Sequence, residues 1–185
     1  MEHITSQTTT RSMVFISLTT AVTCIFAPLS VPIPVSPVPI TLTNLVLFIS
    51  VFLLGWKGSL ISYMLYLFIG FAGLPVFSGF TGGVGKLVGP TGGYLVGFIF
   101  LICIEDLFIR RFQGKKLFHI LGMTLGMAVT YTFGTVWLAV QMNTDFFAAL
   151  SVGVLPYLVG DALKIAVAAL IAPILQERLR MISVH

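Results

Sequence analysis

The segment from Val152 to Leu175 constrains the fold most, because it is strongly apolar and yet contains an acid and a base. Its length matches the roughly 20 residues that an α-helix needs to cross a bilayer. Asp161 and Lys164 are three residues apart, so they share one face of that helix. A charge at the bilayer centre costs about 2.5–3.5 kcal/mol on insertion scales, and a pair that faces a polar cavity costs less than two charges facing lipid. The pair therefore indicates either a functional site or an ion pair that only holds helices together.

Similar apolar runs make up most of the remaining sequence. Of the 185 residues, 57% are hydrophobic and 9% are charged, whereas soluble domains are about 25% charged. At about 20 residues per span, this length allows about six helices and leaves no room for a separate soluble domain. We therefore expect one all-α integral membrane domain over residues 1–185, a six-helix bundle with spans at about 13–27, 41–55, 59–74, 92–109, 117–142 and 152–175.

The distribution of Lys and Arg predicts the orientation of the bundle. If both termini lie on one side, eight of the ten basic residues lie there as well, with Lys86 on the opposite side and Lys164 within the membrane. The eight are Arg11, Lys57, Arg110, Arg111, Lys115, Lys116, Arg178 and Arg180. The positive-inside rule then places the N- and C-termini in the cytoplasm. Because the basic residues are few and lie where a bilayer anchors them, the net charge of +4 does not indicate nucleic-acid binding.

Two irregular segments fall on the outer side in this topology. Residues 28–39 contain five prolines and cannot be helical, and their apolar character favours a lid or packed plug over a short interfacial connector. Residues 75–93 contain seven glycines, so their backbone can approach a ligand closely. Gly85-Lys86 lacks the Ser or Thr that follows in a phosphate loop. Both segments would lie above Asp161 and Lys164, which predicts a cavity that is open to the outside and closed below. Pro156 predicts a kink or break just before the charged pair.

The residues around this cavity favour ligand binding over catalysis. A fitting ligand is small and partly apolar, with one anionic group and a hydrogen-bond donor. An enzyme that uses Asp161 and Lys164 as acid and base is disfavoured, because the chain has no nucleophile–base pair, no HExxH motif and no Asp dyad. No Walker motif is present, so uphill transport would need a partner. The two cysteines form no CxxC or Cys/His cluster, so neither a metal site nor a cofactor is indicated. Glu105 and Asp106 are expected in the headgroup zone.

Four motifs together resemble one family. They are Val38-Pro-Ile-Thr-Leu42, Gly73-Leu-Pro-Val-Phe77, Gly89-Pro-Thr-Gly-Gly-Tyr-Leu95 and Gly160-Asp-Ala-Leu-Lys164. In this order and spacing they resemble the BioY family, the biotin-binding S components of energy-coupling-factor (ECF) transporters. The resemblance covers nearly the whole chain. It implies high-affinity capture of biotin from outside, a transmembrane T subunit and two cytoplasmic ATPase subunits as partners, and a place in the plasma membrane of a prokaryote. An S component for a different vitamin and a purely structural subunit are the alternatives.

The resemblance also implies roles for single residues. Asp161, Lys164 and Tyr94 match binding residues of the family. Asp161 is expected to accept a hydrogen bond from a ureido N–H, and Lys164 either orders Asp161 or binds the biotin carboxylate. Free N–H groups at the helix start of Thr91 and Gly92 compete for that carboxylate, although an ordinary capped helix start is the simpler interpretation.

Two further positions carry expectations from the resemblance. The family commonly has Gln after Pro-Ile-Thr-Leu, where this chain has Thr43, so a long amide is replaced by a short hydroxyl and the neighbouring Asn44 is a candidate to compensate. Ser17 and Ala21 match the small-xxx-small contact of the first helix with the T subunit.

Overall fold

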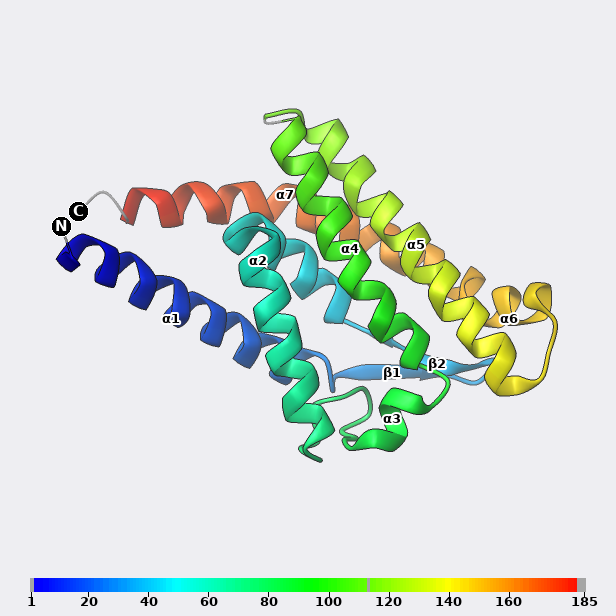
Figure 1. The fold of residues 1–185 in the computed structure, drawn as a ribbon. Helices are drawn as coiled ribbons and strands as arrows, with labels where there is room; N and C mark the ends of the chain where they lie inside the picture. The colour runs from blue at the N-terminus through cyan, green and yellow to red at the C-terminus, as the bar shows by residue number, and fades with distance from the viewer. Residues whose placement is uncertain (1, 113, 183–185) are drawn as a thin grey trace.

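The computed structural model describes residues 2–112 and 114–182, with side chains described over 10–112 and 114–179, and the chain is mainly helical (Figure 1). The helices are α1 (Glu2–Phe26), α2 (Thr43–Phe71), α3 (Val84–Val88), α4 (Gly92–Arg111), α5 (Lys116–Met142), α6 (Phe146–Gly153), the 3₁₀ helix η1 (Leu155–Tyr157) and α7 (Leu158–Ile182). Four stretches are long and apolar enough to cross a membrane, namely Thr43–Phe71, Gly92–Arg111, Lys116–Met142 and Phe146–Leu179. The apolar part of α1, Thr10–Phe26, is shorter.

The chain reverses direction inside α2, at Gly55. Gly55 has a φ of 66° and a ψ of 179°, a backbone conformation that favours glycine. Thr43 and Tyr66, from the two halves, line the same cavity, whereas Gly55 lies against the side chains of Asp106 and Arg110 near the end of α4. The predicted spans at 41–55 and 59–74 therefore correspond to two helical segments of α2 that run in opposite directions and are joined at Gly55.

Residues 30–41 form a β-hairpin, so the prediction of an all-α chain is wrong here. Strand β1 (Ser30–Ile33) pairs antiparallel with β2 (Ser36–Thr41), with Ser30 opposite Thr41 and Ile33 opposite Ser36. The prolines predicted a stiff, non-helical lid or plug, but no pairing of strands. Their fixed φ also suits an extended edge strand. A proline whose nitrogen faces the free edge of the sheet removes no hydrogen bond between the strands. The hairpin and α3 lie at the same end of the molecule (Figure 1).

The glycine-rich segment is fixed to the end of α2 and is not an open loop throughout. The N–H of Gly83 donates to the carbonyl of Gly70 at 2.7 Å, and Phe77 pairs with Thr81 in an isolated β-bridge. Phe77 packs so closely on Gly70 that a Cβ there would lie 2.1 Å from its ring. The short helix α3 follows and leads into α4.

The sixth predicted span is interrupted. The stretch at 152–175 is divided among α6, η1 and α7, and Pro156 lies within η1, where the break before Asp161 was expected. Glu105 and Asp106, which are expected in the headgroup zone, lie near the end of α4. Both side chains are buried: Gly122 of α5 lies beside Glu105, and Gly55 lies beside Asp106.

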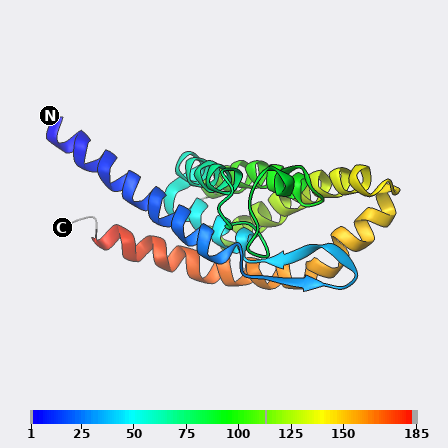
Figure 2. The ribbon, with the colours of Figure 1, turned by 90° about the horizontal axis from the view of Figure 1, so that it is seen from below.

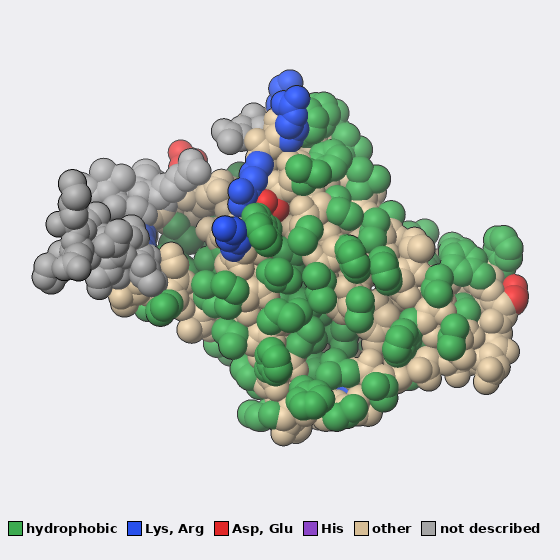
Figure 3. All heavy atoms as spheres, viewed as in Figure 1, with side chains coloured by type: hydrophobic (Ala, Val, Ile, Leu, Met, Phe, Trp, Pro, Cys, Tyr) green, Lys and Arg blue, Asp and Glu red, His purple; other side chains and the backbone are tan. Residues whose placement is uncertain are grey.

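The first turn of α1 and the last turn of α7 lie on the same side of the molecule (Figures 1 and 2). In the space-filling view, basic side chains gather toward the loop that joins α4 and α5, while apolar side chains dominate the rest of that face (Figure 3). A surface on which apolar side chains predominate fits contact with lipid.

Candidate functional site

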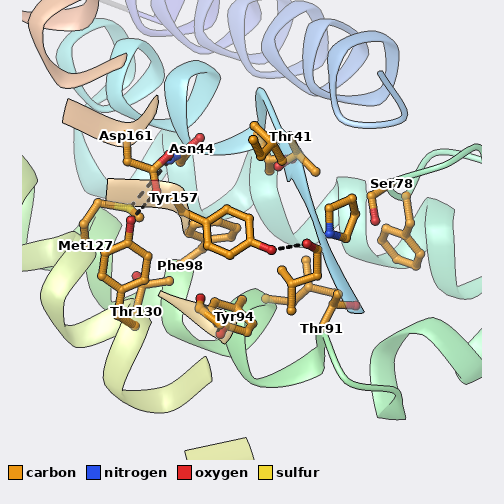
Figure 4. Close-up of a pocket in the computed structure, with 18 of the residues that line it drawn as sticks. Thr41, Asn44, Ser78, Thr91, Tyr94, Phe98, Met127, Thr130, Tyr157 and Asp161 are labelled. Carbon is orange, nitrogen blue, oxygen red and sulfur yellow. Dashed lines mark hydrogen bonds between the residues drawn. The ribbon is translucent and has the colours of Figure 1, made fainter. Parts of the chain in front are cut away.

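A cavity lies where the β-hairpin, the first turns of α2 and α4, the middle of α5 and the first turns of α7 meet (Figure 4). The space between its walls, including its open mouth, is about 670 Å³. Six of the seven residues predicted to bind substrate line it: Thr43, Asn44, Thr91, Tyr94, Asp161 and Lys164. Segments separated by more than 100 positions in the sequence are therefore brought to one place.

Gly92 is the predicted site residue that does not line the cavity. A Cβ at this position would lie 2.0 Å from the carbonyl oxygen of Leu87 and 3.2 Å from Nε1 of Trp137. The glycine therefore allows α3 and α5 to pack closely against the start of α4. Thr91 lines the cavity, but its hydroxyl lies 3.4 Å from the Lys86 carbonyl and does not cap the helix.

Asp161 is the centre of the polar part of the site. Its Oδ1 accepts hydrogen bonds from Nζ of Lys164 at 2.7 Å and from Nδ2 of Asn44 at 2.8 Å, and its Oδ2 accepts one from the hydroxyl of Tyr131. Two ionised carboxylate oxygens offer about four lone-pair positions. Three are used, so Oδ2 has one position left for a donor on a ligand. Charge-assisted hydrogen bonds of this kind are among the strongest in proteins.

The charges around the cavity sum to a positive value. Among the residues that line it, the ionisable acids and bases are Asp161, Lys164 and Lys86. Lys86 belongs to α3, outside the membrane-spanning segments, and burial lowers the pKa of its ammonium group. One carboxylate facing two ammonium groups leaves a net charge of +1 when both lysines are protonated. An anionic ligand would neutralise that charge.

Tyrosines build much of the wall. The Tyr94 hydroxyl donates to the carbonyl of Gly153 at 2.8 Å and so ties α4 to the end of α6. The Tyr157 hydroxyl contacts Oγ of Ser36 at 2.7 Å and donates to the carbonyl of Val38, which fastens β2 over the cavity. Their rings, shown in Figure 4 between the Asp161 end and the Thr91 end, provide flat apolar surfaces for a ligand.

Sequence reasoning missed Tyr131, Tyr157 and Met127. Tyr131 interrupts an apolar run near the middle of α5, and a mid-span tyrosine needs a partner for its hydroxyl. That signal could have identified it. Tyr157 directly follows Pro156 at the predicted break, and nothing in its sequence position indicates that it reaches the β-hairpin. Met127 contacts Asn44, with Nδ2 3.8 Å from its sulfur.

Comparison with known proteins identifies the family. The model of the BioY family matches residues 1–181. The chain belongs to the BioY family. A relative from Pyrococcus horikoshii, named "Probable biotin transporter BioY", is 37% identical over 161 residues, which cover 87% of this chain and 93% of that protein. The "Biotin transporter BioY" of Thermotoga maritima is 38% identical over 142 residues, covering 77% of this chain and 83% of that protein.

A solved structure has the same fold. It is the S-component for biotin from an ECF-type ABC transporter, at 26% identity and a TM-score of 0.86, with 92% of this chain and 93% of that chain covered. BioY proteins are transporters and not enzymes, so the alternative of an intramembrane enzyme is not favoured. The chain is a multi-pass membrane protein of a transporter family.

Proposed function

We propose that this protein captures biotin from outside the cell, as the substrate-binding S component of an ECF-type uptake transporter. The single observation that carries the proposal is the cavity around Asp161. It combines one unused carboxylate lone pair, a net charge of +1 and tyrosine walls within a fold that matches the S-component for biotin. Biotin has a hydrogen-bond donor in its ureido ring, an apolar body and one carboxylate, so its groups complement those of the cavity.

The geometry supports one orientation of biotin. A ureido N–H donates to Oδ2 of Asp161, whose other oxygen is occupied by Lys164 and Asn44. Lys164 therefore orders Asp161, since its Nζ is already 2.7 Å from that carboxylate. The biotin carboxylate then points toward Lys86 and Thr91, at the other end of the cavity. Thr43 and Tyr94 contact the body of the ligand between these ends.

The membrane topology and partners form a second part of the proposal. Both termini lie in the cytoplasm of a prokaryotic cell, the six spans cross its plasma membrane, and the cavity opens outward. The T subunit contacts Ser17 and Ala21, which are exposed one turn apart on the same face of α1. Two cytoplasmic ATPases supply the energy, because the chain itself has no Walker motif.

Titration of the purified protein with biotin, thiamine and riboflavin by calorimetry tests the ligand. We expect biotin to bind with the highest affinity and the other two to bind at least 100-fold more weakly. A preference for thiamine or riboflavin would overturn the assignment of biotin. Mass spectrometry of copurifying small molecules provides an independent readout, and a purely structural subunit would retain none.

Replacing the small residues of α1 tests the partner. Ser17→Leu and Ala21→Leu should prevent copurification with the T subunit while leaving biotin affinity unchanged, because both side chains point away from the cavity. Met13→Leu is a matched control, since Met13 is also exposed on α1 but is already large. Normal assembly of both variants would exclude this face as the contact.

A further inference from the structure

A second groove lies away from the biotin cavity, between α1, α2 and α7. α1 and α7 each pack against α2 but make few contacts with each other. The space between them is lined at one end by Arg11, Lys57 and Gln176, and along its length by apolar side chains. The polar and apolar parts share Phe15, Leu53 and Leu179, so they form one continuous groove.

The polar end of the groove has the chemistry of an anion site. Arg11 donates one hydrogen bond to the carbonyl of Leu179 at 3.4 Å, and a guanidinium has four further N–H donors. Lys57 is exposed and lies over the ring of Trp56, 5.6 Å from its centroid. Over the part of the chain that the structure describes, neither cation is paired with a carboxylate. Two cations at the mouth of one groove attract a negatively charged group.

The apolar part of the groove follows most of the apolar length of α1. On α1 it extends from Phe15 to Phe26, which corresponds to about 16 Å at 1.5 Å per residue. Its other wall comes from the first half of α2, through Leu45, Val46 and Ile49. A hydrocarbon chain anchored at the cationic end would therefore lie along α1 toward Phe26, the end of the helix that leads into the β-hairpin.

We propose that this groove binds one anionic phospholipid of the cytoplasmic leaflet. Its phosphate lies between Arg11 and Lys57, and one acyl chain occupies the apolar part of the groove. The two cations lie on the side that also holds the basic loop between α4 and α5, where an anionic leaflet is favoured. Ser17 and Ala21 are not among the residues that line the groove, so the lipid and the proposed T subunit contact use different faces of α1.

Native mass spectrometry of the full chain in detergent, titrated with dioleoylphosphatidylglycerol or dioleoylphosphatidylcholine, tests the proposal. We expect one phosphatidylglycerol to be retained at least tenfold more tightly than phosphatidylcholine. In Arg11→Gln/Lys57→Gln the preference should fall by about fivefold for each cation removed. Lys115→Gln/Lys116→Gln is the matched control, because it removes two charges from the same side of the molecule but outside the groove. Its preference should stay within twofold of the wild-type value.

A second variant separates the acyl chain from the phosphate. Val46→Trp fills the apolar part of the groove and leaves both cations in place, so it should reduce retention of both lipids. Biotin affinity and the thermal unfolding temperature verify that each variant is folded. Equal retention of the two lipids by the wild-type chain would overturn the proposal. So would displacement of phosphatidylglycerol by 10 mM inorganic phosphate with no effect of Val46→Trp, because the site would then bind a free anion. A retained mass equal to a second copy of the chain would instead assign the groove to self-association.

Discussion

Replacing Asp161 with Asn should weaken biotin binding more than any other single change in the cavity. The substitution keeps the shape of the side chain but removes the charge that Lys164 neutralises at 2.7 Å. The side chains of Asp161 and Lys164 are only 10% and 11% exposed, so the remaining ammonium would face little water. Biotin would lose the hydrogen bond from its ureido N–H to a charged acceptor, and such a bond contributes about 1.5–3 kcal/mol. At about 1.4 kcal/mol for each factor of ten, this predicts roughly 10- to 140-fold weaker binding.

A double-mutant cycle shows what Lys164 does. If Lys164 only orders Asp161, then Lys164→Met should weaken binding, but Asp161→Asn/Lys164→Met should be no worse than Asp161→Asn alone. If Lys164 binds the biotin carboxylate independently, the two losses should add. The geometry favours the first result, because Nζ of Lys164 already donates to Oδ1. Calorimetry with biotin and with biotin methyl ester provides the measurement, since the ester lacks the carboxylate charge.

The controls distinguish a lost contact from a misfolded chain. Each variant should elute as a single species in detergent and unfold cooperatively. Asn44→Asp, which places a second carboxylate beside Asp161, should also weaken binding because the two acids would repel each other or share a proton. If Asp161→Asn binds biotin within threefold of the wild-type affinity, Asp161 does not hold the ureido group and the site assignment is refuted.

Three further changes test the cavity and its supports. Tyr131→Phe removes one of the three donors to the central carboxylate, a hydrogen bond that the chain makes without ligand, and should lower the free energy of unfolding by about 1.5–3 kcal/mol in thermal unfolding. Gly93→Ala places a Cβ 2.3 Å from that of Trp137 and should destabilise the fold by about 1–3 kcal/mol, whereas Gly85→Ala, with open space around it, should leave the unfolding temperature unchanged. Burial lowers the pKa of Lys86 in the folded chain, so its ammonium group loses its proton at a lower pH in the folded chain than in the unfolded chain. The free energy of unfolding of the wild-type chain, relative to that of Lys86→Met, should therefore rise between neutral pH and 10.5. A flat difference over that range in thermal unfolding would contradict the third prediction.

The sequence predicted the polar centre of the site better than it predicted the segments that cover the cavity. A charged pair in an apolar run is costly, and that cost identifies Asp161 and Lys164 without any structure. The partners of this pair lie far away in the chain. Asn44 was considered only as a substitute at the position next to Thr43, and its bond to Asp161 spans 117 positions. Sequence patterns are local, so they indicate that a buried carboxylate needs donors but not which segments supply them.

The β-hairpin was missed for a different physical reason. Proline removes a backbone donor, so a proline-rich segment is normally interpreted as irregular. In a two-stranded ribbon each strand has an outer edge that needs no partner, and prolines fit there. The hairpin also depends on a tertiary contact, since the Tyr157 hydroxyl binds Ser36 and Val38 from more than 100 residues away. No property of residues 28–39 alone specifies that contact.

The elements that cover the cavity are attached to it through the tyrosines that form its wall. The Tyr157 hydroxyl holds the β-hairpin, and the Tyr94 hydroxyl holds the carbonyl of Gly153 at the end of α6. Each of these tyrosines therefore presents its ring to the ligand and its hydroxyl to a covering element. Contact between a ligand and the rings restricts their side-chain torsions, and restricted rings fix the hydroxyls in place. Binding of biotin should thus order the hairpin and the α6–α7 junction together, even though neither segment supplies a charged group to the site.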